Sequence, residues 1–120
     1  MNNKKLGTDF ENEMCEILAH MGYWVHFIVP DSRGAQPFDI IAVKDGKAYA
    51  IDCKTSASKR FPFSRLEENQ ILAFEKWMKC GNSEPCIAVK YDDKIYLIYY
   101  LYLKKTGVVK LGEEDLFIDL

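Results

Sequence analysis

The sequence predicts an α/β fold in which a mixed β-sheet is flanked by helices, and three observations support this class. Two amphipathic helical patterns alternate with short apolar segments in the order α-β-β-β-α-β-β. An Asp45-Gly46 pair between two of these segments is a strong hairpin signal. The 120 residues are enough for one core but not for two, so we expect residues 1–120 to form a single domain.

The elements are expected in the following order. Thr8 and Glu11 match a capping box, which predicts that the first helix begins at Thr8, and Gly22 marks its end. Aromatic and β-branched residues then predict a strand over 23–29, followed by a loop over 30–37. The later elements are expected as hairpin strands at 38–43 and 47–54, a second helix from Ser64 or Arg65 to Gly81, strands at 85–91 and 94–103, a short strand at 107–111, and a terminal helix or arm at 113–120.

Composition limits the possible partners and location. The net charge of −2 argues mildly against a nucleic-acid binder, although cations cluster at Lys4 and Lys5, over 54–60, and at Lys104 and Lys105. The chain shows neither a signal peptide nor a membrane-spanning apolar run, so we expect a cytoplasmic protein without a membrane partner. No phosphate-binding glycine motif occurs, which predicts no nucleotide cofactor. The four cysteines are far apart and are expected to be reduced, mostly buried thiols.

The candidate chemistry lies at one end of the predicted hairpin. Strand alternation places Asp52 and Lys54 on one face, and a turn at Asp45-Gly46 places Asp39 approximately opposite Asp52. Two carboxylates facing each other repel, and a divalent cation such as Mg²⁺ would remove that penalty. Lys54 is then placed to assist an attacking water or to stabilise transition-state charge. The alternative is a surface Asp–Lys ion pair at a strand end.

Glu11 has two interpretations that the sequence leaves open. As the acid of the capping box it needs no metal. On a helical wheel, however, it falls beside Leu18 at the edge of the apolar face, from which a carboxylate can reach a metal held on the sheet. The aromatic residues Tyr96, Tyr99, Tyr100 and Tyr102 favour strand packing or a dimer surface over a base-stacking platform.

The ordered set Glu11, Asp39 and Asp52-Cys53-Lys54 resembles the PD-(D/E)xK nuclease superfamily, and most closely its archaeal-type and phage Holliday-junction resolvases. The resemblance runs from about Lys4 to Tyr91 and includes "AIDCKTS", a following helix with Gln70 and the strand "PCIAVKY". It implies a restriction-endonuclease-like αβββαβ core. It departs from the usual motif in reading Pro37-Phe38-Asp39 where Pro-Asp is common.

The resemblance also implies roles for individual residues. The metal ligands would be Asp39, Asp52, Glu11 and the Cys53 carbonyl, with Mg²⁺ as the cofactor and Mn²⁺ as a substitute. Lys54 would be the catalytic lysine. Ser32 matches a serine that contributes to cleavage, or is simply a turn residue, and Gln70 matches a glutamine near the site, or is an exposed helical residue.

The function expected from these residues is Mg²⁺-dependent hydrolysis of DNA phosphodiesters at a four-way junction. The phosphate contacts are expected from Lys4, Lys5, Arg33, Lys59 and Arg60. Two symmetric cuts call for a C2 homodimer. Two alternatives remain open: another nuclease of the superfamily, acting in restriction, nicking or repair, and a DNA-binding module of the same fold without catalysis.

Overall fold

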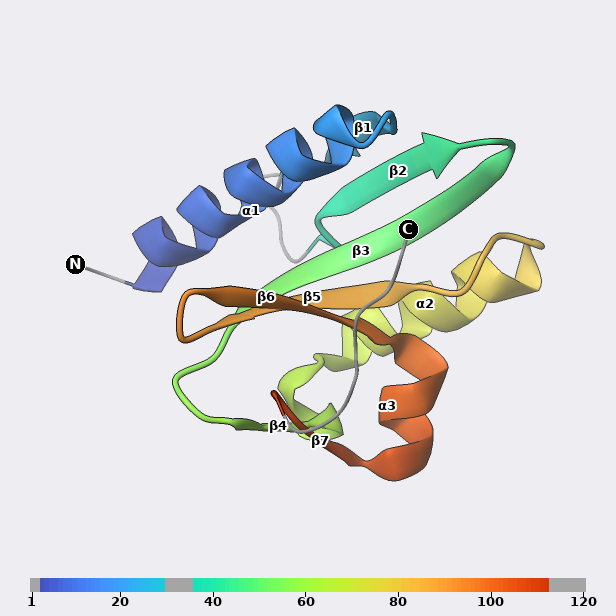
Figure 1. The fold of residues 1–120 in the computed structure, drawn as a ribbon. Helices are drawn as coiled ribbons and strands as arrows, with labels where there is room; N and C mark the ends of the chain where they lie inside the picture. Colours follow the sequence, from blue (N-terminus) through green and yellow to red (C-terminus); the bar gives the residue numbers. More distant parts are fainter. Residues whose placement is uncertain (1–2, 30–35, 113–120) are drawn as a thin grey trace.

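The computed structural model describes residues 3–29 and 36–112, with side chains from Asp9 onward. Its centre is a five-stranded sheet in the order β1-β2-β3-β5-β6 (Figure 1). The pairings are antiparallel except for the parallel contact between β3 and β5, so the sheet is mixed as expected. The strands of this sheet are β1 (Trp24–Phe27), β2 (Ile40–Lys44), β3 (Lys47–Thr55), β5 (Cys86–Tyr91) and β6 (Lys94–Tyr99).

Helices cover both faces of the sheet (Figure 1). The other elements are α1 (Asn3–His20), α2 (Glu68–Lys79), α3 (Tyr100–Thr106), a 3-10 turn (Phe63–Arg65), and a separate two-stranded sheet of β4 (Arg60–Pro62) and β7 (Val108–Lys110). Strand β3 shows how the two cores divide. Ile51 packs with Phe10 and Met14 of α1, whereas Ala50 packs with Phe74 of α2. The side chains of β3 therefore alternate between an α1 core and an α2 core.

The predicted hairpin is confirmed at its expected turn. Lys44 pairs with Lys47, and the two residues between them, Asp45 and Gly46, have positive φ angles of 53° and 77°. Positive φ at both central positions is typical of the tight turn that Asp-Gly favours. This turn fixes the register of β2 against β3, and the register decides which side chains meet at the far end of the hairpin.

Three boundaries differ from the sequence predictions. Helix α1 begins at Asn3, so Thr8 lies inside the helix and cannot cap it; Lys4 and Lys5 are good helix formers that extend it. Helix α2 begins at Glu68 because a 3-10 turn occupies Phe63–Arg65. The apolar segment predicted as one strand over 94–103 changes to helix at Tyr100.

Packing explains why the last of these segments divides. Tyr100 is fully buried, lies 5.2 Å from Phe74 between ring centroids, and donates a hydrogen bond to Glu75. These contacts with α2 hold the chain in a helical turn after β6.

Strand β7 was predicted as part of 107–111, but its partner β4 was missed. The terminal arm expected at 113–120 lies outside the described residues.

Two further expectations concern the thiols and the membrane. All four cysteines are free, but only Cys86 is buried; Cys15 and Cys53 are half-buried and Cys80 is exposed. The expectation of mostly buried thiols was therefore wrong. Among the described residues, no helix combines the length and the apolar character needed to cross a membrane.

Candidate active site

Two carboxylates meet at the end of the hairpin opposite its turn. Ile40 pairs with Ile51, so the register places Asp39 across from Asp52. The backbone of Asp39 is fixed on both sides, since its N–H donates to the Ile51 carbonyl at 3.2 Å and its carbonyl accepts from the Ile28 N–H at 2.8 Å. Asp39 is 5% exposed and Asp52 is 1% exposed. The sequence expectation that these acids face each other is met, and both are buried.

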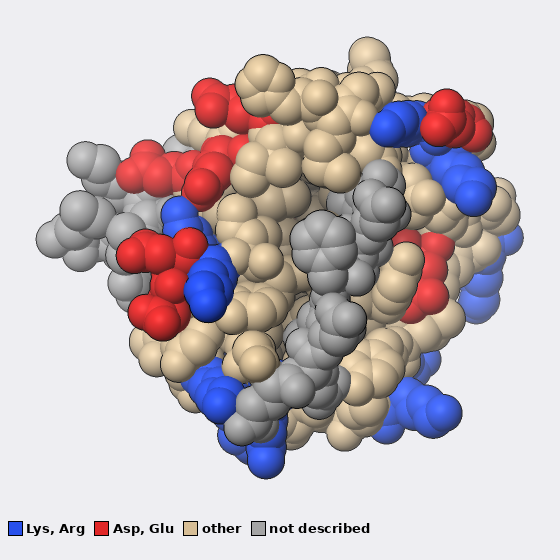
Figure 2. Space-filling model, viewed as in Figure 1, with Lys and Arg blue, Asp and Glu red and all other residues tan. Residues whose placement is uncertain are grey.

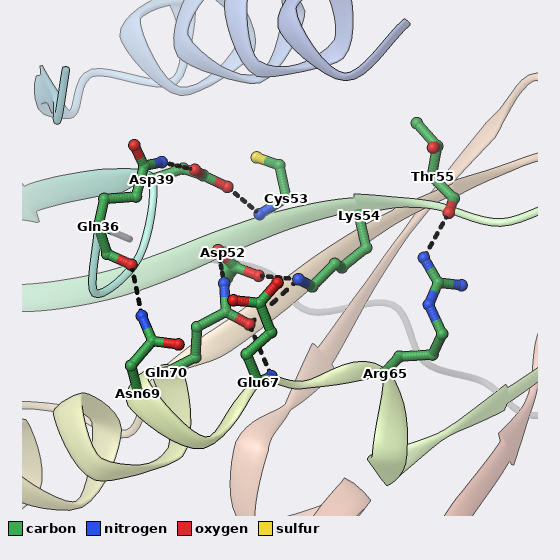
Figure 3. Close-up of polar contacts among 10 residues, drawn as sticks. All are labelled: Gln36, Asp39, Asp52, Cys53, Lys54, Thr55, Arg65, Glu67, Asn69 and Gln70. Atoms are coloured by element: carbon green, nitrogen blue, oxygen red, sulfur yellow. Dashed lines mark hydrogen bonds and ion pairs between the residues drawn. The ribbon is translucent and has the colours of Figure 1, made fainter. Parts of the chain in front are cut away.

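Asp52 is held by a lysine and a glutamine (Figure 3). Its Oδ1 accepts a hydrogen bond from Gln70 Nε2 at 3.0 Å, and its Oδ2 lies 3.3 Å from Lys54 Nζ. Lys54 Nζ also donates to Gln70 Oε1 at 3.1 Å. The Lys54 ammonium is therefore fixed between a carboxylate and an amide oxygen. The side chains of Lys54 and Asp52 are only 16% and 1% exposed, which argues against the alternative of a weak surface ion pair.

Gln70 reaches the site from the first turn of α2. Its Oε1 also accepts from the Glu67 backbone N–H at 3.0 Å, which ties the start of the helix to the sheet. The Gln70 side chain thus makes one donor and two acceptor contacts, and the residue is buried. The alternative of an exposed helical glutamine was wrong.

Asp39 is held by groups that the sequence analysis missed. Its Oδ2 accepts a hydrogen bond from the Cys53 backbone N–H at 2.8 Å, and its Oδ1 accepts from the Gln36 side-chain amide. Asn69 of α2 in turn donates to the Gln36 carbonyl at 3.0 Å. Figure 3 shows this chain of contacts running from α2 through the 36–39 segment to β3. No local sequence pattern indicates it, because the contact depends on how α2 packs against this segment.

Glu11 of α1 adds a third carboxylate beside Asp39. Burial and the nearby Asp39 carboxylate, with which it shares a hydrogen bond, raise the pKa of Glu11 to about 7. Burial and Asp39 also raise the pKa of Asp52 well above its usual value, while Lys54 acts in the opposite direction. Because Thr8 lies inside α1, Glu11 is not the acid of a capping box at the helix start. Its contact with Asp39 favours the interpretation as a member of the site.

The donor set suits a hard divalent cation. Apart from the ion pair with Lys54, buried Asp52 Oδ2 accepts no hydrogen bond from the described residues. Burial and mutual repulsion already favour protonation of Glu11 and Asp52. Among the described side chains, no three His, Cys, Asp or Glu residues are gathered closely enough to form a complete metal site. Mg²⁺ needs only one or two carboxylates and retains several waters, so the residues fit this ion.

Cys53 contributes to the site through its backbone. Its thiol packs in the α1 core, and burial raises its pKa well above the usual range, so the side chain is a poor ligand. Its N–H orients Asp39, while the metal role of its carbonyl stays a prediction.

The remaining predicted residues are distributed differently. Ser32 and Arg33 lie outside the described residues. Lys4 and Lys5 belong to α1, but their side chains are not described. Lys59 precedes β4 and Arg60 begins it, so both follow the site-bearing strand β3. The structure thus gathers Glu11, Asp39, Asp52, Lys54 and Gln70 into one site.

Comparisons with known proteins identify the family of this chain. The archaeal Holliday junction resolvase family, Hjc, matches residues 2–115. A crossover junction endodeoxyribonuclease Hjc from Methanocaldococcus jannaschii is 26% identical over 101 residues, covering 84% of this chain and 71% of that protein.

A solved structure gives the corresponding comparison of folds. The Holliday junction resolvase Hjc of Archaeoglobus fulgidus superposes with a TM-score of 0.68 at 17% identity, over 85% of each chain. At this identity the superposition speaks for the fold, whereas the family match spans nearly the whole chain. The chain belongs to the archaeal Holliday junction resolvase family of the PD-(D/E)xK nucleases.

Proposed function

We propose that this resolvase hydrolyses DNA phosphodiesters at four-way junctions with the aid of Mg²⁺ at the Asp39–Asp52 pair. The chain's family consists of junction-cleaving endonucleases. The observation that carries the mechanism is the buried pair of facing carboxylates, with Lys54 fixed beside Asp52 at 3.3 Å. A buried like-charge pair is costly for folding alone, which supports a role in holding a cation.

Asp39 and Asp52 would bind the ion directly, and Glu11 and the Cys53 carbonyl would join as further oxygen ligands once the ion draws the acids together. A bound divalent cation supplies Lewis-acid stabilisation of phosphoryl charge and activation of water near neutral pH. The Asp39 side chain is oriented by the Cys53 N–H and Gln36, and Asp52 by Gln70. Because oxygen ligands of this kind also suit Mn²⁺, that ion should substitute.

Lys54 would act on the substrate rather than on the metal. Its ammonium is held by Asp52 and Gln70, so it meets the scissile phosphate already oriented. A fixed cation at this position stabilises the negative charge that develops during attack on phosphorus. It also favours the ionised form of Asp52, which the ion requires.

The partner would be branched DNA, bound by a homodimer. Two cuts related by a two-fold axis need two copies of the site. Exposed apolar side chains at the end of β6 and in α3, at Tyr99, Leu101 and Tyr102, are suitable for that interface. Lys4, Lys5, Arg33, Lys59 and Arg60 would contact phosphates, and Ser32 would approach the site from its loop. We expect the protein to act in the cytoplasm without a nucleotide cofactor.

The direct test is cleavage of an end-labelled four-way junction beside a linear duplex, with Mg²⁺ or with EDTA. Wild type should make paired symmetric nicks in the junction alone, and Asp52→Asn or EDTA should abolish them. The matched control is Asp45→Asn, because Asp45 is an exposed acid in the turn of the same hairpin. Cutting of the linear duplex would move the chain to another nuclease type. DNA binding without any Mg²⁺-dependent product would favour a non-catalytic module.

A further inference from the structure

The small β4–β7 sheet has one apolar face and one basic face. Phe61 of β4 pairs with Val109 of β7, and both are fully buried in the α2 core. Their neighbours Arg60 and Lys110 pair with each other at the end of the ladder, and both are exposed. Strand alternation therefore turns these two cations outward, away from the core.

Arg60 and Lys110 are like charges directly opposite each other across an antiparallel pair, an arrangement that destabilises a sheet. Within the described part of the chain, neither side chain has an ion-pair or hydrogen-bond partner. The other cross-strand cation pair, Lys44 and Lys47, differs because Lys44 is tied back to the Met21 carbonyl at 2.7 Å. Binding of an anionic group from another molecule would therefore relieve the repulsion between Arg60 and Lys110.

Arg65 lies between the β4–β7 sheet and the site. Its Nη2 donates to the Thr55 carbonyl at 2.9 Å, one residue beyond Lys54, and its guanidinium lies 5.2 Å from the centre of the Phe61 ring. Arg65 therefore lies between the end of β3 and strand β4. Figure 3 shows its guanidinium held against Thr55 beside the Lys54 network. An arginine held in this way loses little freedom when it binds a phosphate.

Figure 2 shows Lys and Arg side chains gathered at the lower edge of the molecule, where Figure 1 places the β3–β4 connection and the β4–β7 sheet. We propose that Arg65 and the Arg60–Lys110 pair form a phosphate-binding surface that holds the backbone of one helical DNA arm as it leaves the site. This deepens the proposed function, since it names which part of the DNA is held and by which residues. Phosphate contacts of this kind fix the position of the DNA without reading its sequence.

The test is the salt dependence of DNA binding in EDTA, where cleavage does not interfere. Fluorescence anisotropy would follow a labelled four-way junction and a linear duplex from 50 to 200 mM salt. The variants are Lys110→Gln, Arg60→Gln and the double variant. The matched control is Lys47→Gln, an exposed lysine at the far end of β3 from Lys54. Circular dichroism melting would show whether each variant is folded.

Each phosphate contact removed should reduce the slope of log K against log salt by roughly 0.9, and the double variant should lose roughly twice that. The loss should be equal for junction and duplex, because a single helical arm is held, and the melting temperature should not fall. An unchanged slope in the double variant, an equal loss in Lys47→Gln, or a loss restricted to the junction would overturn the proposal. Binding in EDTA is measured independently of cleavage, so a failure of the catalytic assignment would leave this result interpretable.

Discussion

The β2–β3 hairpin carries a pair of like charges at each end, and the two pairs have opposite surroundings. Beside the turn, Lys44 faces Lys47; at the other end, the same register sets Asp39 against Asp52. Lys47 is exposed to solvent, whereas Asp39 is 5% and Asp52 1% exposed. Water screens the first repulsion but not the second.

The two ends also differ in the groups that stabilise the charges. Lys44 needs only the Met21 carbonyl and the face of the Tyr23 ring. The acids engage β3, α2 and the segment before β2, through Lys54, Gln70 and Gln36. The same hairpin thus has a weakly destabilising repulsion at its exposed end and a strongly destabilising one at its buried end. Because the buried repulsion lowers stability, its presence supports a functional role for the two acids.

The largest effect should follow from removing one buried charge. Asp39→Asn should slow junction cleavage by about 10³-fold or more, because an ion ligand is lost. In EDTA at neutral pH the same variant should unfold with a free energy about 0.2–1 kcal/mol higher, since the repulsion is gone. Single-turnover cleavage and urea unfolding would measure the two effects.

Asp45→Asn serves as the control for this prediction, because its exposed side chain lies in the turn. It should change neither quantity. Loss of both activity and stability in Asp39→Asn would mean that the Asp39 charge supports folding rather than ion binding.

The second effect concerns Gln70, whose amide donates a hydrogen bond to Asp52. Gln70→Ala removes the donor to Asp52 and the acceptor for Lys54, so buried polar groups lose their partners. We expect the free energy of unfolding to fall by about 1–3 kcal/mol. Lys76→Ala, an exposed position on the same helix, should stay within about 0.5 kcal/mol. Equal values for the two variants in urea unfolding would contradict a structural role for Gln70.

Glu11 should make the stability of the buried end depend on pH. Its pKa is about 7 in the folded chain against an ordinary value of 4.5, so folding favours its protonated form. This contribution to stability is complete below about 4.5 and is lost as the pH rises through about 7. In EDTA, wild type should therefore lose more stability than Glu11→Gln between these two pH values.

The measurement for Glu11 is the thermal midpoint at several pH values, with Glu16→Gln as the control from an exposed position of α1. Glu16→Gln should follow wild type. Saturating Mg²⁺ should flatten the wild-type curve, because the ion competes with the proton. Parallel curves for wild type and Glu11→Gln would remove Glu11 from the site.

The sequence was sufficient for the parts of the site that depend on local register. Asp-Gly sets the hairpin turn, and counting from it places Asp39 opposite Asp52 and Lys54 on the same face as Asp52. Gln36 and Asn69 were not predictable, because their contact depends on how α2 packs against the segment before β2. The catalytic and metal-binding roles of the site residues stay predictions.

The same distinction explains the errors in the fold. The sequence 95–103 is apolar and aromatic throughout, and the contacts of Tyr100 with Phe74 and Glu75 decide where the strand becomes a helix. Strand β4 has three residues, and its partner β7 lies far along the chain, so no local pattern predicts it. Local signals predicted elements, but long-range packing set their ends.

The smallest effect returns to the exposed end of the hairpin. Lys47→Gln removes a screened repulsion from a solvent-exposed position, so the free energy of unfolding should change by less than about 0.5 kcal/mol. Lys44→Gln should cost about 1 kcal/mol, because it loses the bond to Met21 and the contact with Tyr23. Urea unfolding of both variants measures the difference. A gain from Lys47→Gln as large as that from Asp39→Asn would show that burial does not separate the two ends, and the charge pair at the site would then need another explanation.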